Sequence, residues 1–128
     1  MLLYQNLTVR AYWPIKKMIE LLTPEFLEKF HRERVKQNIE LKVIWPKEQL
    51  AYGKKYGFLQ GGEKMKRAIK ISPEQGNSSL GYSIYGNTVR FISSSRENFG
   101  FLVESEELAE TMRKQFEIIW KQAKNLPK

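Results

Sequence analysis

Residues 7–14 have the sequence Leu-Thr-Val-Arg-Ala-Tyr-Trp-Pro, and residues 39–46 have the sequence Ile-Glu-Leu-Lys-Val-Ile-Trp-Pro. Apolar and polar side chains alternate along both stretches, which is the period of a half-buried strand, and each stretch is closed by a proline that cannot donate to a strand ladder. Between them, Thr23-Pro24-Glu25 has the pattern of a helix start, and Asn38 suits a left-handed helix stop. Strand, helix and strand in this order form a βαβ unit, so we expect the two strands to be parallel.

The buried stripe of that helix is expected at Phe26, Leu27, Phe30 and Val35. The second half of the chain has a different pattern, with short apolar runs around the hairpin signal Gly86-Asn87. We expect strands at Arg67 to Ile71, Leu80 to Tyr85, Thr88 to Ser93 and Phe99 to Glu104, and further helical stretches at Ile15 to Leu22 and Glu48 to Tyr56. The last strands should form an antiparallel meander that is added to the parallel pair.

A long helix is expected at the carboxyl end of the chain. Ser105 is a good N-cap, and Glu106 and Glu107 follow it at the positive end of the helix dipole. Apolar residues then recur at helical spacing. The stripe that contains Met112, Phe116 and Trp120 has two interpretations, namely a helix face packed in the core or a face that binds a partner.

Length and composition bound the class of protein. With 128 residues, of which 41% are hydrophobic, residues 1–128 are expected to form a single domain around one core. The absence of cysteine excludes disulfides and thiolate metal sites and fits a reducing cytoplasm. No apolar run approaches the ~20 residues of a membrane span, and the first residues lack a secretion signal. We therefore expect a cytoplasmic protein that does not enter the membrane.

The net charge of +8 lies entirely in the first half of the chain. Residues 1–70 hold 15 Lys and Arg against 7 Glu, whereas residues 71–128 hold 7 against 7. Such asymmetry can mark a surface that meets nucleic acid. It can also be an ordinary solubilising surface, because Lys and Glu often alternate on exposed helices.

The inventory of catalytic side chains is poor. The chain has one histidine, no cysteine and no aspartate, so all 14 acidic residues are glutamates. His31 lies in the charged run Phe30-His31-Arg32-Glu33-Arg34, where we expect a solvated surface residue. Since no activated nucleophile, acid–base pair or metal-ligand cluster stands out, we expect no enzymatic activity, no metal and no cofactor.

Two Trp-Pro pairs stand at the carboxyl ends of the two parallel strands. Ligands of open α/β sheets bind in the crevice outside those ends. Indole rings with lysines behind them suit a sugar, a nucleotide or a phosphate. The candidate ligand-binding residues are Trp13, Lys16, Lys17, Trp45 and Lys47. The alternative is that both tryptophans cover the edge of the core.

Several segments resemble a known family in their order and spacing: Pro24 to Leu27, His31 to Ile39, Lys42 to Pro46, Ile84 to Val89, Gly100 to Ser105, Leu108 to Thr111 and Phe116 to Trp120. Together they resemble the C-terminal effector domain of TrmB-type transcriptional regulators, which are sugar-responsive in several members. The resemblance implies an α/β fold, a phospholipase-D-like half-unit with a mixed parallel and antiparallel sheet, flanking helices and a long C-terminal helix. Because its motifs are mostly hydrophobic frame residues, it supports the fold better than the function.

The same resemblance bears on catalysis. Phospholipase-D-like enzymes carry the motif His-x-Lys-x4-Asp near a hairpin that ends in Gly-Ser. Here Thr88 to Ser94 is similar to the second strand of that hairpin, so Ser79 falls at the histidine, Gly81 at the lysine and Gly86 at the aspartate. Serine cannot form the phosphohistidine, and glycine supplies neither charge nor a proton. The resemblance therefore implies a fold that has lost its chemistry.

The regulators of this family read DNA through an N-terminal winged helix. No such pattern precedes the first strand here, so we expect an isolated effector domain, with DNA contacted through a winged helix absent from this chain. A further sugar-binding extension, present in some longer regulators, is also missing, which disfavours sugar binding. Phospholipase-D-like units pair about a two-fold axis, so we expect a homodimer with Met112, Phe116 and Trp120 as the candidate interface.

The sequence thus predicts a non-catalytic regulatory domain of a TrmB-type transcriptional regulator, which senses a small-molecule effector or passes a signal through dimerisation. The alternative is a basic module that binds nucleic acid directly. A degenerate phosphodiesterase or nuclease is the minor alternative.

Overall fold

The βαβ unit forms where the sequence predicts it. In the computed structural model, which describes residues 7–13, 23–47, 55, 61–73, 80–93 and 99–125, strand β1 spans Thr8–Tyr12, helix α2 spans Pro24–Lys36 and strand β2 spans Glu40–Trp45. The Thr23 hydroxyl accepts a hydrogen bond from the Phe26 amide at 3.3 Å and caps α2. Asn38 has a φ of 58°, the left-handed conformation that ends the helical segment. The expected helices at Ile15 to Leu22 and Glu48 to Tyr56 lie outside the described residues, apart from Lys55.

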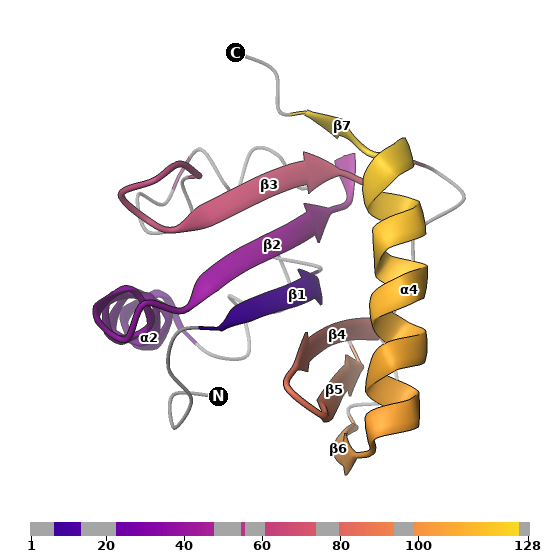
Figure 1. The fold of residues 1–128 in the computed structure, drawn as a ribbon. Helices are drawn as coiled ribbons and strands as arrows, with labels where there is room; N and C mark the ends of the chain where they lie inside the picture. Colours follow the sequence, from indigo (N-terminus) through magenta and orange to yellow (C-terminus); the bar gives the residue numbers. More distant parts are fainter. Residues whose placement is uncertain are drawn as a thin grey trace.

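The described strands form one mixed seven-stranded sheet in the order β6-β5-β4-β1-β2-β3-β7 (Figure 1). Its remaining elements are β3 (Arg67–Ile71), β4 (Leu80–Tyr85), β5 (Thr88–Ser93), β6 (Gly100–Glu104), helix α4 (Glu106–Gln122) and β7 (Lys124–Asn125). Gly86, with a φ of 57°, and Asn87 form the predicted tight turn between β4 and β5. The mixed α/β architecture expected from the sequence is confirmed.

The parallel part of the sheet is larger than the predicted pair. Strand β2 pairs in parallel with β1 on one side and with β3 on the other, while β4, β5 and β6 form the antiparallel meander attached to β1. The sequence also gave no sign of β7, which pairs with β3. A strand of five residues carries no mark of its direction, because direction depends on the sheet end to which the preceding connection returns the chain.

The two helices of the described residues cover opposite faces of the sheet. Side chains alternate along β1, so that Val9 and Ala11 join the core beneath α2 while Tyr12 joins the core beneath α4. Along β2, Val43 and Trp45 likewise belong to the α2 core and Ile44 to the α4 core. Each core therefore takes alternate residues from the same strands.

The buried stripe of α2 differs from the predicted one. Phe26 is 53% exposed, whereas Leu27, His31 and Arg34 are buried. These three residues follow the i, i+4, i+7 spacing of one helix face. The prediction went wrong because it assigned the buried face by hydrophobicity, and here two polar side chains find partners inside the protein.

Helix α4 begins as predicted and packs firmly on the sheet. The Ser105 hydroxyl accepts a hydrogen bond from the Leu108 amide at 3.1 Å. Phe116 is fully buried, and Trp120 stacks on it with 5.7 Å between the ring centroids. The ammonium groups of Lys42 and Lys70 lie 4.8 and 4.7 Å from the Trp120 ring. Met112 packs against the same core, so the whole predicted stripe contacts the sheet of its own chain.

Ion pairs complete the docking of α4. One carboxylate oxygen of Glu117 lies 2.8 Å from Arg10 Nε and 2.9 Å from Lys42 Nζ. Both cations belong to strands of the sheet, so the helix is joined to β1 and β2 by charge as well as by apolar contact.

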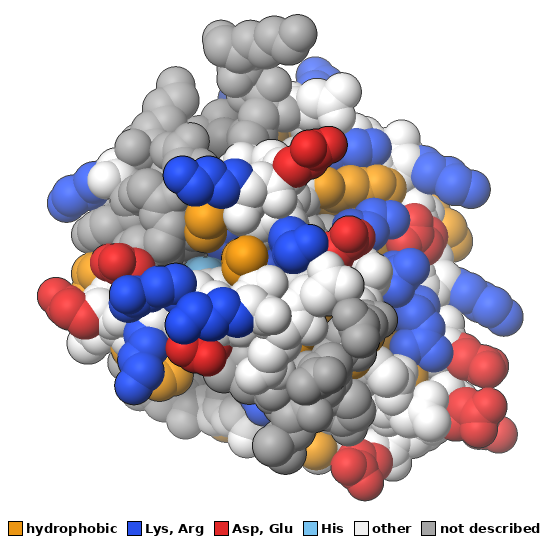
Figure 2. Space-filling view, turned by 60° about the vertical axis from the view of Figure 1, so that its left-hand side comes forward, with side chains coloured by type: hydrophobic (Ala, Val, Ile, Leu, Met, Phe, Trp, Pro, Cys, Tyr) orange, Lys and Arg blue, Asp and Glu red, His pale blue; other side chains and the backbone are white. Residues whose placement is uncertain are grey.

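The surface charges are mixed in sign. Figure 2 shows Lys and Arg interspersed with Glu over the face turned to the viewer.

Candidate functional site

A cavity lies between α2 and the sheet. Its volume is about 190 Å³, and most of its lining is apolar: Val9, Trp13, Phe26, Leu27, Phe30, Leu41 and Ile92. The polar residues that the described part of the chain adds to its walls are His31, Arg34, Tyr82, Ser83 and Arg90, and Gly81 also lines the cavity. Helix α2 supplies one wall, while β1, β2, β4 and β5 supply the other.

Arg34 forms the innermost polar part of the cavity wall. Its Nη1 donates to the carbonyl oxygens of Ile39 and Lys66 at 2.8 and 3.1 Å, and its Nη2 donates to the Met65 carbonyl at 2.6 Å. Its Nε donates to Nδ1 of His31 at 3.2 Å. Burial lowers the pKa of Arg34 to about 10, so the guanidinium stays charged at neutral pH.

His31 is the clearest correction to the sequence prediction. The imidazole expected on the surface is completely buried, with its ring 5.8 Å from that of Trp13 and 5.3 Å from that of Phe30. Nη2 of Arg67 lies 3.0 Å from each ring nitrogen. Burial, with the charges of Arg67 and Arg34, lowers the pKa of His31 to about 2. The ring is thus a neutral acceptor and aromatic wall, unsuited to proton transfer near neutral pH.

Arg67 adds a second buried cation behind the histidine. It is 4% exposed, and burial together with the charge of Arg34 lowers its pKa to about 9. The floor of the cavity is therefore positive at neutral pH, with the charges of Arg34 and Arg67 next to a neutral His31.

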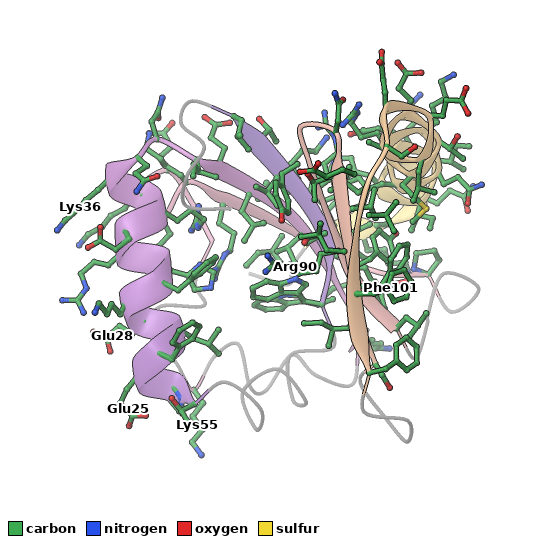
Figure 3. All side chains as sticks on the ribbon, turned by 90° about the horizontal axis from the view of Figure 1, so that it is seen from below. Glu25, Glu28, Lys36, Lys55, Arg90 and Phe101 are labelled. Atoms are coloured by element: carbon green, nitrogen blue, oxygen red, sulfur yellow. The ribbon has the colours of Figure 1, made fainter. Side chains whose placement is uncertain are left out.

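A third arginine stands on the opposite wall. Arg90, on β5, pairs with Ser83 across the hairpin and is partly exposed. Its Nη2 donates to the Tyr85 hydroxyl at 3.3 Å, and its guanidinium carbon lies 5.9 Å from the Tyr85 ring centroid. It lies on the side of the sheet that faces α2 (Figure 3). Among the described residues, neither Arg34 nor Arg90 forms an ion pair with a carboxylate.

The residues predicted to bind a ligand fall in different places. Trp13 directly follows β1, and Trp45 is the last residue of the neighbouring strand β2. Both pack on the α2 face of the sheet, but of the two only Trp13 lines the cavity. Trp45 is 3% exposed and packs in the core, while Lys47 is exposed. Lys16 and Lys17 lie outside the described residues. The structure therefore brings one member of the predicted group to the cavity.

Two of the three positions compared with the catalytic motif are glycines in the described part of the chain. Gly81 lies on β4 in the cavity wall, Gly86 lies in the exposed hairpin turn, and Ser79 is outside the described residues. Across the described ranges, no group of three or more His and Glu side chains could hold a metal ion. No helix within those ranges has the length and apolarity needed to span a membrane.

The fold has solved counterparts. TrmBL2, an archaeal chromatin protein whose structure shows a novel mode of DNA binding, aligns with 98% of this chain at a TM-score of 0.71 and 13% identity. This chain spans about half of TrmBL2, 47% of its length. Nuc from Salmonella typhimurium, a phospholipase D family member, aligns with 99% of this chain and 86% of its own, at a TM-score of 0.66 and 10% identity.

The chain has the phospholipase-D-like fold. The fold resemblance inferred from the sequence is thereby confirmed. The chain is similar in fold both to a TrmB-type protein and to a phospholipase D family member. No protein-family model matches the sequence, and a search among curated proteins finds no match. At these identities the likeness concerns the fold alone.

The phospholipase-D-like fold holds a cavity that hydrophobicity alone did not reveal. The usable signal was the spacing of Leu27, His31 and Arg34, which places three residues on one face of α2. Arg90 and Ser83 carried no such signal, because they join the cavity only through the pairing of β4 with β5.

The buried histidine makes stability depend on pH. The folded pKa of about 2 lies below the ordinary 6.5, so below pH 6.5 the unfolded chain binds a proton that the folded protein does not. Stability is complete above pH 6.5 and falls as the pH drops towards 2. Between pH 7.5 and 5.5 the free energy of unfolding should decrease by about 1.4 kcal/mol, as measured by urea denaturation.

His31→Gln provides the comparison, because His31 is the only histidine of the chain. The variant keeps a neutral polar side chain and should lose this pH dependence between pH 7.5 and 5.5. Equal slopes for the wild type and the variant would contradict the role assigned to His31.

Proposed function

We propose that this chain is a non-catalytic regulatory domain that senses a small molecule, as part of a TrmB-type transcriptional regulator. The observation that carries the proposal is the cavity beside the wall where phospholipase-D-like enzymes place catalytic groups. At that wall this chain has Gly81, and in the adjoining turn it has Gly86. This chain thus has a cavity next to positions where the resemblance implies catalytic groups and the sequence has glycines.

The buried histidine supports a role without catalysis. A covalent nucleophile or general base must reach the substrate and exchange a proton near the working pH. His31 is fully buried, and its low pKa keeps it neutral. The residual alternative, a degenerate phosphodiesterase, would have to act without a cysteine, an aspartate or a second histidine.

Direct binding of nucleic acid is the second candidate. It is favoured by the net charge of +8 and by the likeness in fold to the chromatin protein TrmBL2. Against it, basic side chains are interspersed with Glu on the face shown in Figure 2. Lys36, for example, lies 3.7 Å from Glu33. A winged helix outside this chain remains our proposal for sequence-specific contact with DNA.

A homodimer is part of the proposal, because a regulator that reads two half-sites must present two DNA-binding heads. The interface predicted from the sequence lies on α4 at Met112, Phe116 and Trp120. Since Phe116 is fully buried within one chain, α4 would meet a partner through its outer side, where Ile118 is 59% exposed. Strand β6 offers another apolar surface, because Phe101 and Leu102 are 48% and 49% exposed there.

One prediction of this proposal concerns hydrolysis. The protein should not hydrolyse bis-p-nitrophenyl phosphate with or without divalent metal ions, because Ser79, Gly81 and Gly86 stand at the three positions of the catalytic motif that the resemblance implies. Release of p-nitrophenol measures this directly. Turnover that disappears in His31→Ala or in a Glu substitution would overturn the non-catalytic function.

The next prediction concerns DNA. The isolated domain should bind duplexes weakly and without preference for sequence, and the binding should weaken steeply with salt, because phosphate contacts release counterions. Fluorescence anisotropy with several duplexes at low and physiological salt measures both properties. Sequence-selective binding at physiological salt would favour the second candidate instead.

Another prediction concerns the oligomeric state. Light scattering at micromolar concentration should give a mass twice the 15.1 kDa of the chain. Ile118→Glu and Phe101→Glu are matched substitutions of exposed residues on the two apolar surfaces, and the one that yields a monomer locates the interface. A wild-type mass of 15.1 kDa refutes the dimer.

A further inference from the structure

We infer that the cavity between α2 and the sheet binds a small apolar carboxylic acid, with its apolar part beside Trp13 and Phe30 and its carboxylate at Arg90. The inference rests on the proposed sensing function and names the class of effector. It concerns a different location from the predicted Trp-Pro site at the strand ends, with which it shares Trp13.

The size of the cavity limits the ligand to a small molecule. Its volume is about 190 Å³. An apolar cavity of ~150 Å³ is large enough to hold benzene. The space therefore suits one six-membered ring with a short polar substituent, and it is too small for a disaccharide or a nucleotide, whose sites are several hundred Å³.

The wall chemistry favours an apolar body. Trp13 and Phe30 offer aromatic surfaces from opposite sides, one after β1 and one from α2, while Leu27, Leu41 and Ile92 supply aliphatic contacts. Such a wall offers the hydroxyl groups of a sugar few hydrogen-bond partners, so burying them would cost free energy. An aromatic ring has no hydroxyl groups to leave without partners when it moves from water into the cavity.

The charges favour an anionic head group. Arg34 is enclosed, and its donors are directed at three carbonyl oxygens and at His31. Arg90 is partly exposed, and among the described residues its hydrogen-bond partner is the neutral hydroxyl of Tyr85. A carboxylate beside Arg90 would therefore gain charge-assisted hydrogen bonds without displacing an existing ion pair.

Two small residues keep the sheet side of the cavity open. Gly81 and Ser83 are alternate residues of β4 and both line the cavity, opposite Ile92 and Arg90 of β5. A large side chain at position 81 would fill space next to Ile92. In this fold, the absence of a lysine at Gly81 thus removes a catalytic group and also leaves room for an apolar ligand.

Three matched probes test the ligand class: phenylacetate, the neutral 2-phenylethanol and the cationic 2-phenylethylamine. Isothermal titration calorimetry and chemical-shift perturbation on the full chain measure affinity and location. We expect saturable binding of phenylacetate, at least about tenfold tighter than that of 2-phenylethanol, and no binding of 2-phenylethylamine. Shifts should centre on Trp13, Phe30 and Arg90. Equal affinity for the acid and the alcohol, or no saturable binding of phenylacetate, overturns the inference.

Variants then separate the charge from the space. Arg90→Gln should abolish the preference for the acid and leave binding of 2-phenylethanol unchanged, whereas Arg32→Gln, on the exposed side of α2, should change neither. Gly81→Leu should prevent binding of both compounds, and Ile92→Trp fills the same space if the first variant does not fold. Circular dichroism checks folding. Full binding of phenylacetate by folded Gly81→Leu or Ile92→Trp places the ligand elsewhere and overturns the inference.

The outcomes also distinguish this inference from the proposed function. If phenylacetate fails to bind and the protein hydrolyses no phosphodiester, the class of ligand is wrong and the non-catalytic function stands. If the protein hydrolyses bis-p-nitrophenyl phosphate, the proposed function fails whatever the cavity binds.

Discussion

The guanidinium of Arg34 ties together the first half of the fold. From a position inside α2 it donates to the carbonyl of Ile39, just before β2, and to the carbonyls of Met65 and Lys66, just before β3. One side chain thus fixes the end of the helix against the starts of two parallel strands. Charge-assisted hydrogen bonds of this kind each contribute about 1.5–3 kcal/mol, and buried carbonyls left without them are costly.

Burying this charge constrains what surrounds it. Arg34 and Arg67 are both enclosed, and the acceptors around Arg34 are neutral backbone carbonyls and an imidazole. Burial, together with the two cations, disfavours a charge on His31, so the ring stays neutral and acts as an acceptor. A histidine held in this way has a structural role. It also forms part of the wall of the neighbouring cavity, where the buried positive charge favours an anionic ligand.

The likeness to a phospholipase D family member makes the contents of β4 and its turn informative. In this chain β4 and β5 pair in full register, and Gly86 has the left-handed conformation. Glycine is favoured at such a turn because it has no Cβ to oppose a positive φ. In the buried wall, Gly81 brings no side-chain volume into the cavity. Packing constraints preserve a sheet without preserving the polar groups mounted on it, which is how one fold serves both hydrolysis and other roles.

The sequence by itself determined the local structure of this protein. The helix caps at Thr23 and Ser105, the left-handed stop at Asn38 and the turn at Gly86-Asn87 all depend on the chemistry of adjacent residues, and all are present as predicted. The alternation along residues 7–14 and 39–46 likewise predicted the two parallel strands. It does so because successive side chains of a strand point to opposite faces of the sheet.

The tertiary structure alone decided the burial of His31 and Arg34, the direction of β3 and the cavity. Hydrophobicity ranks a histidine and an arginine as surface residues. The burial of Arg34 is compensated by carbonyl oxygens just before β2 and β3, and that of His31 by the guanidinium groups of Arg34 and Arg67. The cavity joins α2 with β4 and β5, which are far apart in the sequence. The local sequence pattern indicates whether a side chain is more stable buried or exposed to water. A buried polar group depends in addition on hydrogen-bond partners that only the complete fold brings close to it.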